Sequence, residues 1–123
     1  MSRIVISEPT AVRNLPYNER VRVILFTGTE WCPACTHLES SVMATKEWQA
    51  FERGEIAFTK IDVPADRSRL KSGDRTLISR YSVRSYPTMV VIDAKGKELS
   101  RQVGSGAPVE NYKDWIRRHE RFY

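Results

Sequence analysis

Apolar runs alternate with polar segments along most of the chain, and four of these runs predict strands. Residues 21–26 (VRVILF) are β-branched and apolar, which favours a strand buried on both faces. Residues 56–62 (IAFTKID) alternate apolar and polar positions, and residues 88–92 (TMVVI) are again apolar. The turn sequence Asp-Ala-Lys-Gly at 93–96 predicts a hairpin into a last strand at 97–103.

Two helical pieces are expected between the first two strands. Pro33 predicts a helix start, because proline at the first helical position has no hydrogen bond to lose. This helix is expected to run to about Met43. A second piece is predicted at 46–53, with Thr45 as its N-cap.

The second half of the chain holds two more predicted helices. Residues 64–73 are polar and predict a loop, and the helix expected at 76–81 has one apolar face, formed by Leu77, Ile78 and Tyr81. Residues 108–122 are amphipathic, with an inner side made of Val109, Tyr112, Trp115, Ile116 and Phe122. A weak strand at 4–6 and a short helix at 11–15 are expected before the first strong strand.

The resulting order is β, α, β, α, β, α, β, β, α. It predicts an α/β fold with a central mixed β-sheet of four to five strands, flanked by helices. The chain shows no internal repeat, low-complexity tract or linker. Its 123 residues therefore predict a single domain, with residues 1–19 as an N-terminal extension and 20–122 as the core.

Composition narrows the class of protein. Hydrophobic residues make up 41% and charged residues 28%, which is typical of a globular chain. The longest strongly apolar stretch, residues 23–26, is too short to cross a membrane, and the N-terminus lacks the pattern of a secretory signal. The chain as given is predicted to be cytoplasmic, or extracytoplasmic if an export signal or anchor was removed.

The chain is basic, with 20 Lys and Arg against 15 Asp and Glu and a net charge of +5. Basic residues cluster at 66–75 (DRSRLKSGDR) and 116–122 (IRRHERF). Such clusters attract an acidic partner, an anionic membrane surface or nucleic acid. No nucleic-acid-binding motif accompanies the charge, so a solvated surface is the simplest interpretation and no nucleic-acid partner is predicted.

The only two cysteines, Cys32 and Cys35, lie three positions apart in the sequence WCPAC. A cysteine attacks a disulfide as the thiolate, and an unperturbed cysteine has a pKa of ~8.5. Cys32 directly precedes the predicted helix, where unpaired N–H groups and the helix dipole favour the thiolate. Cys35 follows one helical turn later. We therefore expect Cys32 to be the nucleophile and Cys35 to resolve the mixed disulfide.

Other uses of two cysteines fit the sequence less well. Covalent haem attachment requires a histidine directly after the second cysteine, whereas Thr36 stands there and His37 comes one place later. A structural zinc site needs four ligands, and the pair supplies two, with no recognisable ligand spacing to His37 or His119. A chain of this size needs no disulfide staple. Redox exchange is favoured, while metal binding and an inert pair stay open.

A second signal is Pro87, directly before the strand at 88–92. The order of strand VILF, turn TGTEWCPAC, helix, strand, helix, Tyr86-Pro87-Thr88, strand, hairpin and terminal helix resembles the thioredoxin-like superfamily over residues 20–122. The segment FTGTEWCPACTHLES is most similar to small thioredoxin-like thiol–disulfide reductases. It is also similar to the C-terminal domain of the transmembrane thiol–disulfide interchange proteins.

The resemblance implies a thioredoxin fold and roles for the residues that match its motifs. It implies that Pro87 is cis and lies beside the cysteines, and that a substrate polypeptide adds like a strand across Tyr86 and Thr88. It implies that Trp31 flanks the nucleophile as part of an apolar docking surface. It further implies that Tyr86, before the proline, tunes substrate release and limits capture of metal by the thiols.

The sequence departs from the family at two places. Thioredoxins proper carry a buried aspartate six residues before the first cysteine, where this chain has Phe26. Deprotonation of the resolving thiol must then use water, substrate groups, or Glu30 or His37 as a proton relay, or it proceeds more slowly. The cysteines enclose Pro33 and Ala34 instead of Gly-Pro, which leaves the direction of electron flow open.

We predict an enzyme, a thiol–disulfide oxidoreductase that reduces protein disulfides through a Cys32/Cys35 dithiol–disulfide cycle. It is expected to use no cofactor and no metal, to receive electrons from an upstream thiol reductant, and to be a monomer. A glutathione-dependent, glutaredoxin-like enzyme, favoured by Pro33, and an oxidising disulfide donor remain alternatives. A redox-inert or metal-capturing binding module with the same fold is the alternative of another class.

Overall fold

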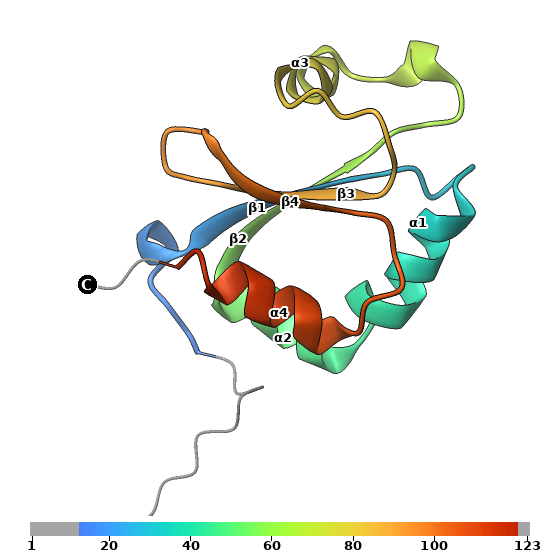
Figure 1. The fold of residues 1–123 in the computed structure, drawn as a ribbon. Helices are drawn as coiled ribbons and strands as arrows, with labels where there is room; N and C mark the ends of the chain where they lie inside the picture. The colour runs from blue at the N-terminus through green and yellow to red at the C-terminus, as the bar shows by residue number, and fades with distance from the viewer. Residues whose placement is uncertain (1–12, 121–123) are drawn as a thin grey trace, which may run out of the picture.

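The four predicted strands form one mixed sheet, in the order β2-β1-β3-β4, in the computed structural model, which describes residues 13–120 (Figure 1). The central strand β1 (Val21–Thr27) runs parallel to β2 (Ile56–Asp62) and antiparallel to β3 (Thr88–Ile92). The edge strand β4 (Glu98–Val103) pairs antiparallel with β3. The predicted fold class is confirmed.

The helices between β1 and β2 begin and end close to the predicted positions. Helix α1 (Pro33–Leu38) continues as a π-helical turn, η2 (Glu39–Met43), and α2 (Lys46–Gly54) follows. Thr45 is the N-cap of α2, and its Oγ1 accepts a hydrogen bond from the Trp48 amide at 3.1 Å. The break at Thr45 therefore has the physical cause that the sequence indicated.

Helix α3 (Ser72–Arg80) begins four residues before the predicted position. A short 3-10 helix, η3 (Arg67–Arg69), also lies within the segment predicted as a loop. The first turn of α3 is Ser-Gly-Asp-Arg, which carries no apolar residue, so hydrophobic spacing gives no sign of it. The predicted apolar face is confirmed: Leu77, Ile78 and Tyr81 pack on the sheet.

The two ends of the described chain differ from the prediction. Helix α4 (Val109–Arg117) ends before residue 122, and Phe122 and the strand predicted at 4–6 lie outside the described residues. Residues 13–15 of the short helix predicted at 11–15 are not helical, because the following Pro16 disfavours helical backbone before it. A 3-10 turn, η1 (Tyr17–Glu19), follows instead.

Both faces of the sheet are covered, which explains the continuous apolar sequence of β1. Figure 1 shows the sheet edge-on, with α3 on one side and α2 and α4 on the other. Val23 and Leu25 contribute to the core beneath α2 and α4, whereas Ile24 and Phe26 contribute to the core beneath α3. Among the described helices, none has the length and apolar character that a membrane crossing requires.

A buried carboxylate ties three segments together. Glu55, directly before β2, is fully buried and accepts hydrogen bonds from Arg117 of α4 at 2.7 and 2.9 Å and from Arg13 Nη2 at 2.8 Å. Burial opposes ionisation of Glu55, but the hydrogen bonds outweigh it and lower its pKa to about 2. Glu120 also pairs with Arg13, and burial together with nearby Glu55 raises the pKa of Glu120 to about 7.

Replacing Glu55 tests this cluster. We expect Glu55→Gln to lower the free energy of unfolding at neutral pH by about 3 kcal/mol, because it leaves the partly buried guanidinium of Arg117 without its main countercharge. The folded-state pKa lies below the ordinary value of 4.5, so the wild-type carboxylate stabilises the fold above that value and loses this effect as pH falls toward 2. The difference in the free energy of unfolding between wild type and Glu55→Gln should therefore become smaller as the pH falls.

The measurement is urea unfolding at a series of pH values. Asp114→Asn, an exposed change of the same chemistry on α4, is the matched control and should shift stability by less than about 0.5 kcal/mol. Equal effects of the two substitutions would show that the Glu55 cluster does not stabilise the fold.

Candidate active site

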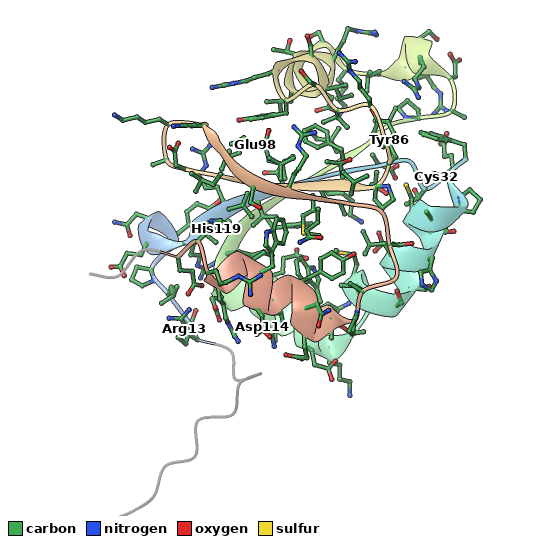
Figure 2. The ribbon with its side chains drawn as sticks, in the orientation of Figure 1. Arg13, Cys32, Tyr86, Glu98, Asp114 and His119 are labelled. Carbon is green, nitrogen blue, oxygen red and sulfur yellow. The ribbon has the colours of Figure 1, made fainter. Side chains whose placement is uncertain are left out.

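Adjacent strands bring the two sequence signals together. Phe26 in β1 pairs with Thr88 in β3, so the turn that follows β1 lies beside the loop that precedes β3. The Cys32 Sγ lies 3.6 Å from the Tyr86 carbonyl oxygen, to which its thiol donates (Figure 2). The Tyr86–Pro87 peptide bond is cis, as the family resemblance implied.

The two thiols lie at the start of α1 and differ in exposure. Cys32 is the N-cap residue, with extended backbone, and its Sγ accepts a hydrogen bond from the Cys35 amide at 3.2 Å. Both cysteines are free thiols. Cys32 is 8% exposed and Cys35 is 1% exposed, so an incoming disulfide meets Cys32 first.

The Cys35 thiol is held in its protonated form. Burial, followed by its hydrogen bond with Cys32, raises the pKa of Cys35 to about 11. A hydrogen bond from the Thr27 hydroxyl and another from the Gly28 backbone act in the opposite direction. Phe26 occupies the position of the family's aspartate and is fully buried against Tyr81, with ring centres 6.4 Å apart. No carboxylate stands at that position to remove the Cys35 proton.

Trp31 forms an exposed aromatic surface beside Cys32. Its Nε1 donates to the Val63 carbonyl at 2.9 Å, and its ring meets the Tyr86 ring edge-on, with centres 5.5 Å apart. The Trp31 side chain packs directly on Gly28, where any Cβ would collide with the indole ring. Sequence analysis missed Gly28 and Thr27, because only the folded turn places them against the indole and the thiol.

The remaining docking residues differ in accessibility. Tyr86 is partly buried, whereas Pro87 and Thr88 are buried. The Thr88 hydroxyl donates to the Ser85 carbonyl at 2.6 Å, and its backbone is paired within the sheet, opposite Phe26 and Val103. Trp31 and Tyr86 therefore present the accessible surface, and Pro87 and Thr88 hold the loop beneath it.

Glu30 and His37 lie on the surface near the cysteines in sequence. The Glu30 carboxylate accepts hydrogen bonds from the Ala65 amide and from Arg69 Nη2, both at 2.9 Å. These bonds lower the pKa of Glu30, so it is ionised at neutral pH. His37 is exposed on α1. Neither is among the groups that act on the Cys35 pKa, and their role as a proton relay stays a prediction.

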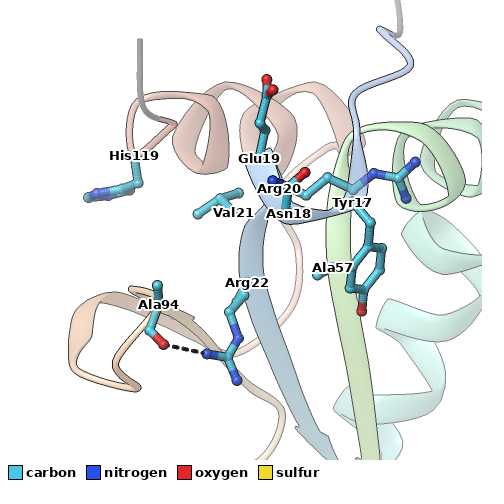
Figure 3. Close-up of a pocket in the computed structure, with 9 residues that line it drawn as sticks. All are labelled: Tyr17, Asn18, Glu19, Arg20, Val21, Arg22, Ala57, Ala94 and His119. Carbon is cyan, nitrogen blue, oxygen red and sulfur yellow. Dashed lines mark hydrogen bonds between the residues drawn. The ribbon is translucent and has the colours of Figure 1, made fainter. Parts of the chain in front are cut away.

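Two further features concern metal binding and a pocket away from the thiols. Within residues 13–120, no group of three or more His, Cys, Asp or Glu side chains is arranged to hold a metal ion. A pocket of about 320 Å³ lies at the start of β1, between η1, Ala94 and His119 (Figure 3). Arg22 spans part of it and donates to the Ala94 carbonyl at 3.0 Å. Cys32 follows the other end of β1, so this pocket is separate from the thiols.

Comparison with known proteins agrees with the architecture. The sequence model of the thioredoxin-like domain matches residues 10–120. The chain is similar to the disulfide bond reductase DsbH of Chlamydia pneumoniae, with 28% identity over 90 residues, covering 68% of this chain and 54% of that protein. The chain thus spans about half the length of this curated relative.

Two solved structures show the same fold. The DsbH oxidoreductase superposes with a TM-score of 0.71 at 21% identity, covering 96% of this chain and 92% of that one. The reduced C-terminal domain of DsbD from Neisseria meningitidis gives a TM-score of 0.63 at 18% identity, covering 83% of each chain.

The environment of Cys35 predicts its titration. In Cys32→Ser protein, which keeps the burial that raises the Cys35 pKa but loses the hydrogen bond with Cys32, alkylation of Cys35 by iodoacetamide should still accelerate with pH above about 8.5, because the thiolate is scarce below its pKa. Thr27→Val should move this profile to higher pH by removing the hydroxyl that lowers the pKa. Thr29→Val on the same turn is the matched control. A profile that levels off near pH 8.5 would contradict the assigned environment.

Proposed function

Because the chain belongs to the thioredoxin-like domain family, we propose that it is a thiol–disulfide oxidoreductase that reduces disulfide bonds in other proteins. One observation carries the proposal: the Cys32 sulfur lies against the Tyr86 carbonyl, beside a cis proline, and Cys32 is more exposed than Cys35, whose thiol is buried behind it. This arrangement separates an attacking thiol from a resolving thiol.

The proposed reaction has two exchanges. The Cys32 thiolate attacks one sulfur of the client disulfide, forming a Cys32–client mixed disulfide and releasing one client thiolate. The Cys35 thiolate then attacks the Cys32 sulfur, forming the Cys32–Cys35 disulfide and releasing the second client thiolate. The client gains two electrons and two protons, and the protein loses them. The second step requires the Cys35 proton to leave first.

The accessible surface supports docking of an extended client segment. Trp31 and Tyr86 offer adjoining aromatic rings beside Cys32, and aromatic surface of this kind anchors polypeptide partners. The client backbone would run along Tyr86, with Pro87 and Thr88 supporting the loop from below. The cysteine pair carries the electrons itself, so the cycle needs no bound cofactor. An upstream thiol reductant would restore the dithiol.

Trapping the intermediate tests the roles of the two cysteines. Cys35→Ser should accumulate a mixed disulfide with a peptide that contains one intramolecular disulfide, because Cys35 is no longer there to attack the Cys32 sulfur, provided that the freed peptide thiol is alkylated to prevent its back-attack. Cys32→Ser should form no adduct, and the double variant is the control. Intact-protein mass spectrometry before and after reduction measures the adduct. Equal adduct formation by Cys32→Ser would exclude Cys32 as the nucleophile.

Reduction of the same peptide by protein that keeps both cysteines tests the proposed proton relay. A slower release of peptide thiols by Glu30→Gln or His37→Gln, with Cys32 attack unchanged, would assign that residue to the removal of the Cys35 proton. Unchanged release in both variants would leave water or client groups as the proton acceptors.

The reduction potential tests the direction of electron flow. We expect a value in the thioredoxin region, near ~−270 mV, because strong oxidants owe their potential to a stabilised reduced form, and the buried Cys35 gains no stabilisation as a thiolate here. Equilibration in glutathione buffers, with mass-spectrometric counting of alkylated thiols, measures it. A value near ~−120 mV would instead identify a disulfide donor.

A further inference from the structure

A positively charged side chain, Arg67, contacts the aromatic docking surface formed by Trp31 and Tyr86, and it has no part in the proposed reaction. The Arg67 guanidinium lies over the Trp31 ring, 5.4 Å from its centre. Trp31 in turn meets Tyr86, whose carbonyl oxygen contacts the Cys32 sulfur. Arg67 thus reaches the rim of the site from η3, on the loop between β2 and α3.

The loop that carries Arg67 is held by several hydrogen bonds. The Asp66 side chain caps η3 by accepting from the Ser68 amide at 3.0 Å, and Arg75 Nη2 donates to the Arg67 carbonyl at 3.4 Å. The Trp31 indole is fixed to the start of the same loop through the Val63 carbonyl. The cation and the aromatic ring are therefore positioned before a partner arrives, which lowers the cost of binding.

Arg67 takes part in no ion pair among the described residues. Its neighbour Arg69, in contrast, pairs with Glu30 at 2.9 Å. Burial raises the pKa of Tyr86 and the charge of Arg67 opposes that shift, so the field of Arg67 reaches the Tyr86 phenol. Lys71 and Arg75 are exposed on the same segment, which keeps a net positive charge although it also carries Asp66 and Asp74.

We propose that Arg67 makes the docking surface selective for client segments that carry aspartate or glutamate beside the disulfide. This inference rests on the proposed function, because the client is defined by the disulfide that it brings to Cys32. A carboxylate next to the client cysteine would meet the guanidinium while the disulfide meets the sulfur. The ion pair between Arg67 and the client carboxylate would lie at a solvent-exposed rim, so it affects the rate of productive docking more than the affinity.

The position of Arg67 favours a polypeptide over a membrane or nucleic acid. Binding to phosphate backbones draws on many cations at once. Here the neighbouring Arg69 is already paired with Glu30, and the unpaired cation is stacked on the ring that flanks the reactive thiol. Charge at this point acts on whatever segment occupies the site at Cys32.

Two isomeric peptides with one intramolecular disulfide provide the test. They have the same composition, and two glutamates lie either next to a cysteine or at the far terminus, so overall charge is identical. A third peptide carries glutamine in place of glutamate. The measured quantity is the second-order rate constant for reduction by the prereduced protein, followed by acid quenching and separation of the peptide thiols. Comparing protein variants on one peptide cancels the intrinsic reactivity of that disulfide.

The variants are Arg67→Glu, Arg67→Gln and the control Lys95→Glu. Lys95 is exposed in the turn between β3 and β4, at the end of β3 away from Pro87, and receives the same change of charge. We expect wild type to reduce the isomer with adjacent glutamates about three to ten times faster than Arg67→Glu does, with Arg67→Gln between them. Lys95→Glu should match wild type, and added salt should shrink the preference.

The possible outcomes distinguish failure of the proposed oxidoreductase function from failure of the proposed selectivity for acidic segments. If no peptide is reduced, including the glutamine peptide, the proposed function itself fails. If all three peptides are reduced at equal rates by wild type and Arg67→Glu, the oxidoreductase stands and the charge selectivity is wrong. If Arg67→Glu leaves the peptide rates unchanged but abolishes binding to vesicles of anionic lipid or to single-stranded DNA, the basic segment serves that partner and the selectivity is again overturned.

Discussion

The antiparallel pairing of β1 with β3 is the constraint on which the site depends. It sets the end of β1 beside the start of β3, so a turn that carries Cys32 meets a loop that carries Pro87. The apolar sequence of β1 secures this pairing, because its side chains alternate between two cores and a one-residue slip would exchange them. The position of the reactive sulfur is therefore determined by burial on both faces of the sheet.

Burial also distinguishes the two cysteines, Cys32 and Cys35, which are chemically identical side chains. Cys32, at the helix start, keeps 8% of its surface exposed, whereas Cys35, one turn later, keeps 1%. Burial raises the pKa of Cys35. In the proposed cycle, this shift would slow premature resolution of the mixed disulfide, and client release would depend on loss of the Cys35 proton. With Phe26 at the aspartate position, Thr27 is the side chain of β1 that eases this step.

Local signals in the sequence predicted most of the fold. The proline at position 33 and the cap at Thr45 act through neighbouring backbone, so their effects could be inferred without tertiary structure. The start of α3 could not, because its first turn has no apolar residue. The burial of Glu55 was equally hidden, since its partners Arg13 and Arg117 come from distant segments.

The candidate site shows the same division between local and tertiary information. The cysteine spacing and the Tyr86-Pro87 pair could be interpreted from the local sequence. The effect of a charged side chain depends on which groups the fold places beside it. Residues 66–75 include four basic and two acidic residues, and the sequence alone favoured a solvated surface. The fold pairs Arg69 with Glu30 and stacks Arg67 on Trp31, so two exposed arginines on either side of Ser68 acquire different partners. The proposed charge selectivity comes from this asymmetry and not from the net charge of the chain.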